Sequence, residues 1–288
     1  MMIRKSFAKI NITLEILGKR NDGYHNISSL MQTIDLSDEI TFAYSDTIKL
    51  RSNLRSMETD DNLIIKAASS LSKLTGYTRG ADIYLNKKIP LSSGMGGGSS
   101  NGACALLALN SLWGLNLSSN ELLGICEDLG SDVSFFLGHG TALVQGKGNI
   151  IETVEHLPRL YFVIVTPDVE IHNKTSLLYS HVTTEMFTEG AFSRDVVNRI
   201  SHNLPLRGGD TCNVFSDIYH NIFPEIDWYR NNLIECGAEW VQFTGSGPSL
   251  YTFSEDEQLA LDIINKLVHR GIRCTLSSTT SPGITDLI

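Results

Sequence analysis

The first half of the chain alternates apolar and polar positions with a period of two, the pattern of half-buried β-strands. The runs that show it are residues 3–17, 27–36, 39–50, 81–89 and 140–155. The turn string Asn21-Asp22-Gly23 follows the first run, and Gly146-Lys147-Gly148 divides the last run into a hairpin. We therefore expect several antiparallel strands before residue 155.

Helical spacing of apolar residues appears between these runs. The predicted helices cover residues 62–74, 103–113 and 118–130. Ser118 and Glu121 form a capping-box pattern at the start of the third helix. Ser131 or Asp132 can cap a further short helix through Leu137.

The pattern changes near residue 155, where short apolar strands begin to alternate with longer helical segments. The predicted elements are strands at 160–166, 240–244, 249–253 and 272–277, with helices between 174 and 236 and at 255–270. This order predicts an α+β fold with two domains, residues 1–155 and 156–288.

Composition and charge exclude several classes of protein. The 288 residues suit one large domain or two medium ones, and a hydrophobic content of 42% supports an ordinary core. The net charge of −9 argues against a nucleic-acid surface, and the longest apolar run, Ala103–Leu109, is too short for a membrane span. The five cysteines are widely spaced and form no C-x-x-C pair, so we expect a reduced, cytoplasmic protein without a zinc site or disulfide framework.

A glycine-rich stretch between a predicted strand and a predicted helix is the strongest chemical signal. It consists of Pro90, Leu91, Ser92, Ser93, Gly94, Met95, Gly96, Gly97, Gly98, Ser99 and Ser100. Free N–H groups at the start of a helix bind phosphate, and glycines let the backbone come close to it. A plain flexible turn is the alternative, but such turns need only about 2–6 residues. The patterns G-x-x-x-x-G-K-[ST] and G-x-G-x-x-G do not fit.

Three strings together resemble the GHMP kinases. The glycine stretch resembles their P-x-x-x-G-L-G-G-G-S-S motif, with Met95 in place of leucine. Ser6–Asn11 is similar to their P-A-K-x-N opening, although Phe7 departs from it, and Thr244–Gly247 resembles their T-G-S-G loop. The resemblance spans nearly the whole chain. It implies a ribosomal-S5-domain-2-like N-terminal domain that binds ATP, a ferredoxin-like C-terminal domain, and the cofactors ATP and Mg²⁺.

Further strings narrow the resemblance to the 4-diphosphocytidyl-2-C-methyl-D-erythritol kinase family. Gly18–His25 is similar to its G-x-R-x-D-G-Y-H, Asp61–Leu63 to its D-N-L, and Leu129–Phe136 to its L-G-A-D-V-P-F-F. The resemblance implies a phosphotransferase that acts on the 2-hydroxyl of an alcohol carrying a cytidine diphosphate group, in the non-mevalonate route to isoprenoids. It further implies a monomer or weak homodimer that binds neither nucleic acid nor membrane.

The resemblance assigns catalysis to Lys9 and Asp132. A carboxylate close to the hydroxyl can accept its proton, and a neighbouring ammonium keeps that carboxylate ionised. Without the resemblance, Asp132 would be interpreted as a helix N-cap and Lys9 as a solvated strand residue.

The remaining assigned residues bind nucleotide or substrate. The resemblance places Asn62 and Lys87 with the glycine stretch around ATP, although Lys87 alone would pass for a surface lysine. The substrate residues that it implies are Asn11, Tyr24, His25, Asn101, Thr175, Tyr179, Gly245 and Ser246. An aromatic next to an imidazole suits stacking on a base and bonding to its edge. We expect Tyr179 on the second face of cytosine, although its segment lies about two residues further after Pro167 than in the family.

Two alternatives stay open at this point. Another GHMP kinase, acting on mevalonate or homoserine, would keep the glycine stretch but would not need Gly23-Tyr24-His25. A non-catalytic nucleotide-binding or regulatory protein on the same scaffold would be favoured if Lys9 or Asp132 were absent. Asn213 stays outside the predicted site, because the acidic residues that usually follow such an asparagine in the family are missing.

Overall fold

The computed structural model describes residues 1–138, 140–169 and 171–280, and they form two sheets. The first contains β1 (Met2–Asn11), β2 (Thr13–Lys19), β3 (His25–Ser45), β4 (Lys49–Ser52), β5 (Gly80–Asn86), β6 (Thr141–Gly146), β7 (Ile150–Thr153) and β9 (Cys212–Asn213). The second has the order β10 (Gln242–Phe243), β11 (Leu250–Ser254), β8 (Tyr161–Val165) and β12 (Cys274–Ser278), with antiparallel neighbours throughout.

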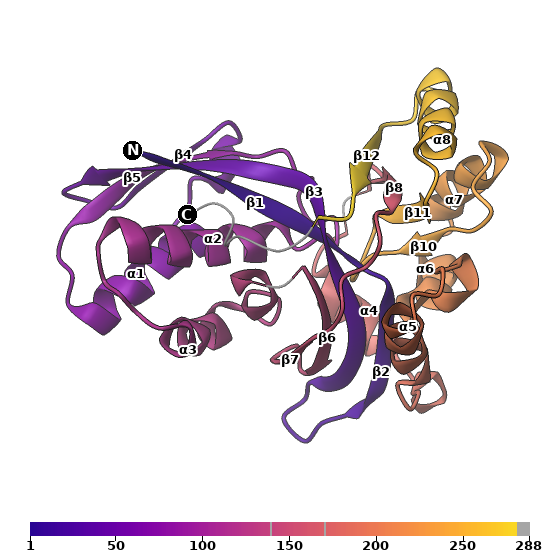
Figure 1. Cartoon of the computed structure of the whole chain (residues 1–288), viewed down its shortest axis with the longest axis horizontal. Helices are drawn as coiled ribbons and strands as arrows, with labels where there is room; N and C mark the ends of the chain where they lie inside the picture. Colours follow the sequence, from indigo (N-terminus) through magenta and orange to yellow (C-terminus); the bar gives the residue numbers. More distant parts are fainter. Residues whose placement is uncertain (139, 170, 281–288) are drawn as a thin grey trace.

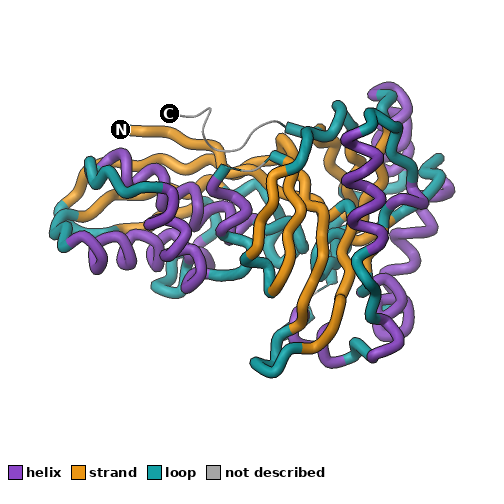
Figure 2. The backbone as a smooth tube through the Cα atoms, turned by 60° about the horizontal axis from the view of Figure 1, so that its bottom comes forward, coloured by secondary structure: helices purple, strands orange, loops and turns teal. Residues whose placement is uncertain are grey.

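Helices cover each sheet. Figure 1 shows the helices of the first half on one side of the long strands, and those of the second half beyond the far end of these strands. The first group is α1 (Leu63–Thr75), α2 (Gly97–Leu112) and α3 (Ser119–Leu129). The second is α4 (Lys174–Ser180), α5 (Ala191–Ser201), α6 (Phe215–Ile222), α7 (Glu225–Glu235) and α8 (Glu257–His269). Short 3₁₀ turns are η1 (Arg55–Met57), η2 (Ser134–Leu137), η3 (Thr184–Met186) and η4 (Gly208–Asp210). Figure 2 shows the same separation from another direction.

The apolar spacing that predicted α1 marks its buried face. Ile64, Ala67, Ala68 and Leu71 are all fully buried against α2 and the first sheet. The predicted capping box of α3 is confirmed, because Ser118 accepts from the Glu121 amide while the Glu121 carboxylate accepts from the Ser118 amide. The predicted hairpin at 140–155 is also confirmed, as β6 and β7.

Two strand predictions are wrong in their limits. Residues 27–36 and 39–50 were expected as separate strands, but β3 runs through 21 residues from His25 to Ser45. The register against β1 jumps from Ser37 opposite Phe7 to Ile34 opposite Ala8, so β3 carries extra residues there. A bulge interrupts the alternation of the sequence without ending the strand. Conversely, the run 3–17 is divided at Ile12 into β1 and β2.

The two halves of the chain share packing and pairing. Ile10 and Ile12 from the first sheet lie in one apolar cluster with Phe162 and Tyr251 from the second. The short β9, far along the chain, pairs in parallel with β2. The predicted boundary near residue 155 falls between β7 and β8 and stays a prediction.

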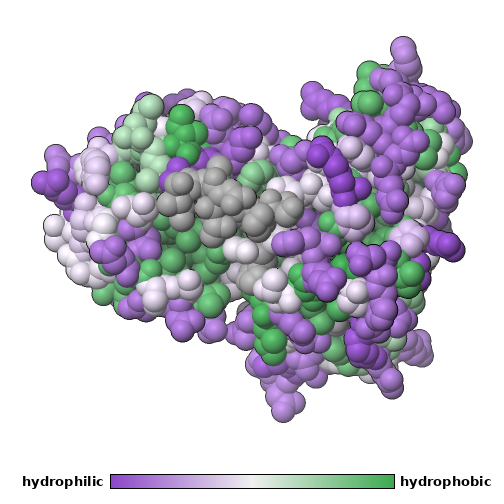
Figure 3. All heavy atoms as spheres, viewed as in Figure 1, coloured by the Kyte–Doolittle hydropathy of each residue, from purple (hydrophilic) through white to green (hydrophobic). Residues whose placement is uncertain are grey.

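No described helix is long and apolar enough to cross a membrane. On the face drawn in Figure 3, hydrophilic residues predominate over the second half, and hydrophobic ones reach the surface in small separate areas.

Candidate active site

The glycine loop, Pro90–Ser100, turns directly from β5 into α2. The helix begins at Gly97, earlier than its apolar run predicts, and Gly96 precedes it with a left-handed φ of 68°. No side chain caps this end, so its first N–H groups are available to an anion. The amide of Lys9 donates to the Met95 oxygen at 3.0 Å, which fastens the loop to β1.

Glycine is required where this loop meets the second half of the chain. Gly94 has a φ of 82°, and a Cβ there would lie 2.2 Å from the main-chain oxygen of Thr244. A Cβ on Gly96 would lie 2.9 Å from the ring of Phe136. The backbone can therefore make these approaches only without a side chain.

Lys9 and Asp132 form an ion pair beside this loop. The distance from Lys9 Nζ to Asp132 Oδ2 is 3.7 Å. Lys9 is buried and also donates to Asn11 Oδ1, whereas 32% of the Asp132 side chain is exposed. Burial lowers the pKa of Lys9, and the Asp132 carboxylate opposes part of that shift. The pair combines a proton acceptor open to solvent with a fixed cation.

The plain structural interpretations of these two residues are wrong. Lys9 is enclosed rather than solvated. The predicted cap of a short helix by Ser131 or Asp132 is absent, since η2 begins at Ser134 after Val133 and has no side-chain cap. Asp132 lies before that turn and is free to act on another group.

The T-G-S-G loop, Thr244–Gly247, connects β10 to β11 and lies against the end of β1. The Asn11 amide donates to Thr244 Oγ1 at 3.1 Å. A Cβ on Gly245 would lie 3.0 Å from Lys9 Nζ, so the ammonium is directly beneath this loop. The hydroxyls of Thr175 and Ser246 are 3.1 Å apart.

Three aromatic rings gather near the turn between β2 and β3. The rings of His25 and Tyr179 are stacked with centroids 5.1 Å apart, and Phe187 meets His25 edge-on at 6.4 Å. Burial, and then the charge of Lys19, lower the pKa of His25. The structure thus brings His25 and Tyr179 together.

Tyr24 points elsewhere. Its side chain is 60% exposed, and among the described residues no ring packs against it. It borders a pocket of about 190 Å³ whose other lining residues are Glu127, Asp128, Gly130, Ser131, Ser134, Lys147 and Asn149. Two of these lining residues, Ser131 and Ser134, flank Asp132 in the sequence.

Comparison with known proteins identifies the family. The family model described as "GHMP kinases N terminal domain" matches residues 62–140, and the one described as "GHMP kinases C terminal" matches residues 207–273. The 4-diphosphocytidyl-2-C-methyl-D-erythritol kinase of Dehalococcoides mccartyi strain 195 is 34% identical over 276 residues, covering 96% of this chain and 97% of the relative. That of Carboxydothermus hydrogenoformans is 38% identical, covering 92% of each. The chain belongs to the 4-diphosphocytidyl-2-C-methyl-D-erythritol kinase family of GHMP kinases.

Solved structures agree with this family. A crystal structure titled as 4-(cytidine 5'-diphospho)-2C-methyl-D-erythritol kinase has a TM-score of 0.82 and 26% identity, covering 96% of this chain and 98% of that one. A homoserine kinase from Cytophaga hutchinsonii, at 19% identity and a TM-score of 0.72, shares the fold. The predicted family and the predicted α+β GHMP kinase fold are confirmed.

The two residues predicted beside the glycine loop around ATP, Asn62 and Lys87, are each held by hydrogen bonds or ion pairs within the protein. Asn62 caps α1, because its Oδ1 accepts from the Ile64 amide at 3.0 Å. Lys87 is buried, so its interpretation as a surface lysine is wrong, and its Nζ lies 2.6 Å from Asp38 Oδ2. Burial lowers the pKa of Lys87, and Asp38 opposes that shift. A Cβ on Gly97 would lie 2.8 Å from Lys87 Nζ, which places this ammonium at the start of α2.

Sequence reasoning missed Asp38. This fully buried carboxylate accepts from the amides of Lys88 and Ile89 at 2.7 and 2.8 Å. It also accepts from Asn101 Nδ2, which donates to Ser6 Oγ as well. Asn101, predicted to bind substrate, therefore belongs to the network under the glycine loop. The only signal for Asp38 was its position in the gap between two predicted strands.

Two further residues support these loops: Asn213, which stayed outside the predicted site, and Lys174, which sequence reasoning missed. Asn213 donates to the main-chain oxygens of Phe243 and Gly245, at 3.0 and 2.9 Å, and so supports the T-G-S-G loop. Lys174 donates to the main-chain oxygens of Ser92 and Gly247. Lys174 lies outside every motif quoted above, and Asn213 lies in a segment that only partly resembles one of the family.

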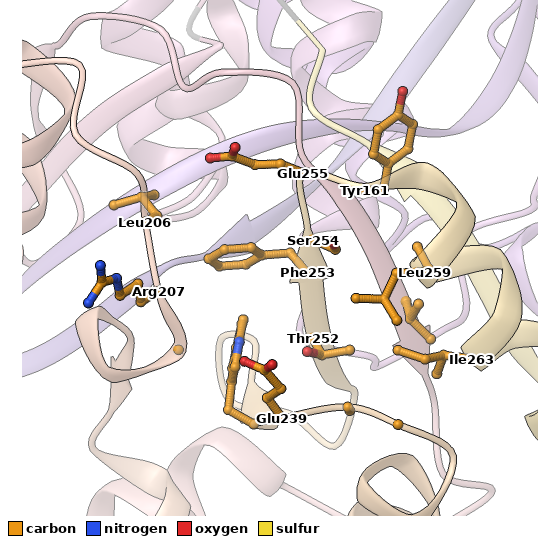
Figure 4. Close-up of a pocket in the computed structure, with 16 residues that line it drawn as sticks. Tyr161, Leu206, Arg207, Glu239, Thr252, Phe253, Ser254, Glu255, Leu259 and Ile263 are labelled. Atoms are coloured by element: carbon orange, nitrogen blue, oxygen red, sulfur yellow. The ribbon is translucent and has the colours of Figure 1, made fainter.

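A second cavity of about 380 Å³ lies in the C-terminal half and is drawn in Figure 4. Its lining residues include Phe253, Trp240, Arg207, Glu239 and Glu255. None of the predicted site residues lines it.

Proposed function

We propose that this chain transfers the γ-phosphate of ATP to the 2-hydroxyl group of 4-diphosphocytidyl-2-C-methyl-D-erythritol, in the isoprenoid precursor pathway that does not use mevalonate. The observation that carries the proposal is the Lys9–Asp132 pair at the meeting point of the glycine loop and the T-G-S-G loop. The names of the relatives and the family's G-x-R-x-D-G-Y-H string support the choice of alcohol.

The chemistry follows from these positions. The 2-hydroxyl oxygen attacks the γ-phosphorus, its O–H bond breaks, and Asp132 takes the proton. The bond from phosphorus to the bridging oxygen of ADP breaks at the same time, and its electrons stay with ADP. Lys9 stabilises the ionised Asp132 carboxylate and the negative charge that develops on the transferred phosphate, while the N–H groups at the start of α2 bind phosphate oxygens.

Mg²⁺ would neutralise charge on the β- and γ-phosphates. In the described part of the chain no three His, Cys, Asp or Glu side chains gather as a metal centre. A Mg²⁺ ion that arrives with the nucleotide does not need such a cluster, because it takes at most one or two carboxylates from the protein. No protein carboxylate is assigned to the ion, because Asp132 is the proposed proton acceptor and Asp38 is fully buried.

Cytosine recognition is proposed for Tyr24, His25 and Tyr179. In the structure His25 covers one face of Tyr179. We infer that the imidazole moves to the edge of the base, so that Tyr24 and Tyr179 stack on its two faces. Asn11, Thr175, Gly245 and Ser246 would face the erythritol and diphosphate portions. We further propose a cytoplasmic enzyme that works as a monomer or weak homodimer.

A panel of alcohols tests this function. The purified chain is given ATP, Mg²⁺ and in turn the cytidyl alcohol, 2-C-methyl-D-erythritol 4-phosphate, mevalonate or homoserine, and release of ADP is measured. Phosphorus NMR then locates the new phosphate. We expect turnover only with the cytidyl alcohol and a phosphate on its tertiary 2-hydroxyl. Comparable kcat/KM values for mevalonate or homoserine would refute the choice of substrate and leave the GHMP kinase family standing.

A further inference from the structure

Lys174, the first residue of α4, connects the two loops of the candidate active site. It exposes only 9% of its surface, and its Nζ donates to the main-chain oxygens of Ser92 and Gly247. Ser92 belongs to the glycine loop and lies 82 residues earlier in the chain, whereas Gly247 lies 73 residues later. A single ammonium group therefore bridges segments from both halves of the chain.

The backbones of these loops already touch beside Lys174. The Ser249 amide donates to the Ser93 oxygen at 3.3 Å, and Gly94 packs directly on Thr244. Because the loops are in contact, a shift of one against the other would move the start of α2, where phosphate would bind, relative to Lys9. Lys174 is the side chain that donates to both.

The backbone at Ser92 needs support. Its φ of 52° lies in the left-handed region, where a residue with a Cβ carries strain. Strained positions persist when the surrounding contacts hold them, and they gather at functional sites. The hydrogen bond from Lys174 to the Ser92 oxygen supplies such a contact.

The charge of Lys174 is unusual for a buried group. Within the described residues no carboxylate pairs with it. Burial, and then the neighbouring charge of Lys9, lower its pKa to about 8. Lys9, Lys174 and Asp132 thus place two ammonium groups and one carboxylate at the junction of the loops, a balance that suits phosphate oxygens.

We propose that Lys174 is a positioning residue for phosphoryl transfer, which fixes the glycine loop against the T-G-S-G loop and keeps positive charge near the transferred phosphate. The inference rests on the proposed function, because these loops are where the proposed kinase holds ATP and its alcohol. It adds a residue outside the Lys9–Asp132 pair and outside the motifs that the sequence shows.

A purely structural role makes a different prediction. If Lys174 only anchored α4, its loss would lower the melting temperature and activity together. Methionine has a similar volume and loses the two hydrogen bonds, but it also removes the cost of burying an ammonium with which no described carboxylate pairs, so we expect only a small net loss of stability. Loss of function with retained stability therefore distinguishes positioning from anchoring.

The test compares Lys174→Met and Lys174→Arg with the parent, and Lys266→Met, at an exposed position of α8, serves as the matched control. Three quantities are measured for each: the melting temperature, the Kd of the non-hydrolysable analogue AMP-PNP, and kcat and KM with the cytidyl alcohol. We expect Lys174→Met to melt within a few degrees of the parent, to bind AMP-PNP about tenfold more weakly, and to lower kcat about tenfold or more, because charge-assisted hydrogen bonds are lost. Lys174→Arg retains the charge and donors and should recover most of the AMP-PNP affinity.

Parent-like AMP-PNP affinity and kcat in Lys174→Met would overturn the proposal. So would an equal loss of stability and activity in both Lys174 variants, which would mark an anchor. Failure of the proposed function looks different: the parent would bind AMP-PNP but leave the cytidyl alcohol unphosphorylated. In that case the Kd values of the two variants alone decide the role of Lys174.

Discussion

Replacing Asp132 with asparagine removes the proposed proton acceptor and changes little else. Asparagine has nearly the same shape, and no side-chain cap of η2 is lost because Asp132 makes none. The substitution converts an ion pair of 3.7 Å, whose Asp132 side chain is 32% exposed, into a contact between Lys9 and a neutral amide. The perturbation is therefore electrostatic and chemical rather than steric.

Two magnitudes separate catalysis from stability. Unit charges at this distance attract by about 1 kcal/mol in water and about 4 kcal/mol at an effective dielectric constant of 20. Partial exposure of Asp132 and the cost of burying Lys9 leave a net change in unfolding free energy of about 1 kcal/mol, or a few degrees in melting temperature. Loss of a general base lowers kcat by about 10²–10⁴-fold, which is about 3–5 kcal/mol of barrier. The effect on the reaction should thus exceed the effect on the fold.

The assay measures kcat with the cytidyl alcohol, the Kd of AMP-PNP and the melting temperature for Asp132→Asn. Asp262→Asn, at an exposed position of α8, is the matched control. We expect kcat to fall at least about 100-fold, with AMP-PNP affinity within a few-fold of the parent. A variant that turns over within a few-fold of the parent would remove Asp132 from the mechanism, and a fall in kcat matched by a large fall in melting temperature would refute the separation argued above.

Three further predictions concern the loops and the base. Tyr24→Ala should lower kcat/KM for the cytidyl alcohol by the factor that corresponds to about 1–3 kcal/mol of lost stacking energy, while the KM for ATP stays unchanged. An equal fall in kcat/KM for the alcohol and for ATP would contradict this. Gly94→Ala should abolish measurable AMP-PNP binding because its methyl would lie 2.2 Å from a carbonyl oxygen, whereas Gly98→Ala, with nothing within 4 Å, should fold and melt as the parent does. Because burial and Lys19 lower the pKa of His25, its neutral ring should persist below pH 6.5, so kcat/KM for the cytidyl alcohol should fall only in more acidic buffer. Lys19→Gln raises that pKa and should move the acidic fall to higher pH, and an unmoved profile would exclude His25 as the titrating group.

Features that depend on neighbouring residues were predictable from the sequence. The glycine loop is one, since Gly94 and Gly96 adopt left-handed φ values of 82° and 68°, a local backbone conformation that favours glycine. The capping box at Ser118 is another, because both of its hydrogen bonds join residues three apart. The family strings around Lys9 and Asp132 directed attention to a pair that the structure brings within 3.7 Å.

Features that depend on distant contacts were not predictable. Asp38 meets Lys87 and Asn101 across 49 and 63 residues, and Lys174 meets its acceptors across 82 and 73. A single sequence does not show which residues so far apart in the chain come into contact. The long β3 was divided for a related reason, because a bulge against β1 disturbs the alternation on which strand prediction depends.

The distribution of buried charge gives the two sides of the glycine loop different tasks. Beneath the loop, Asp38 and Lys87 neutralise one another at 2.6 Å, and the carboxylate also holds two main-chain amides. At the junction with the T-G-S-G loop, Lys9 pairs with Asp132 at 3.7 Å, and Lys174 has no ion pair within the described residues. A chain with a net charge of −9 that is to hold a nucleoside triphosphate must keep positive charge at the phosphates. The Asp38–Lys87 pair therefore suits a structural support for the loop, and Lys174, with which no carboxylate of the described residues pairs, is the ammonium placed to respond to phosphate.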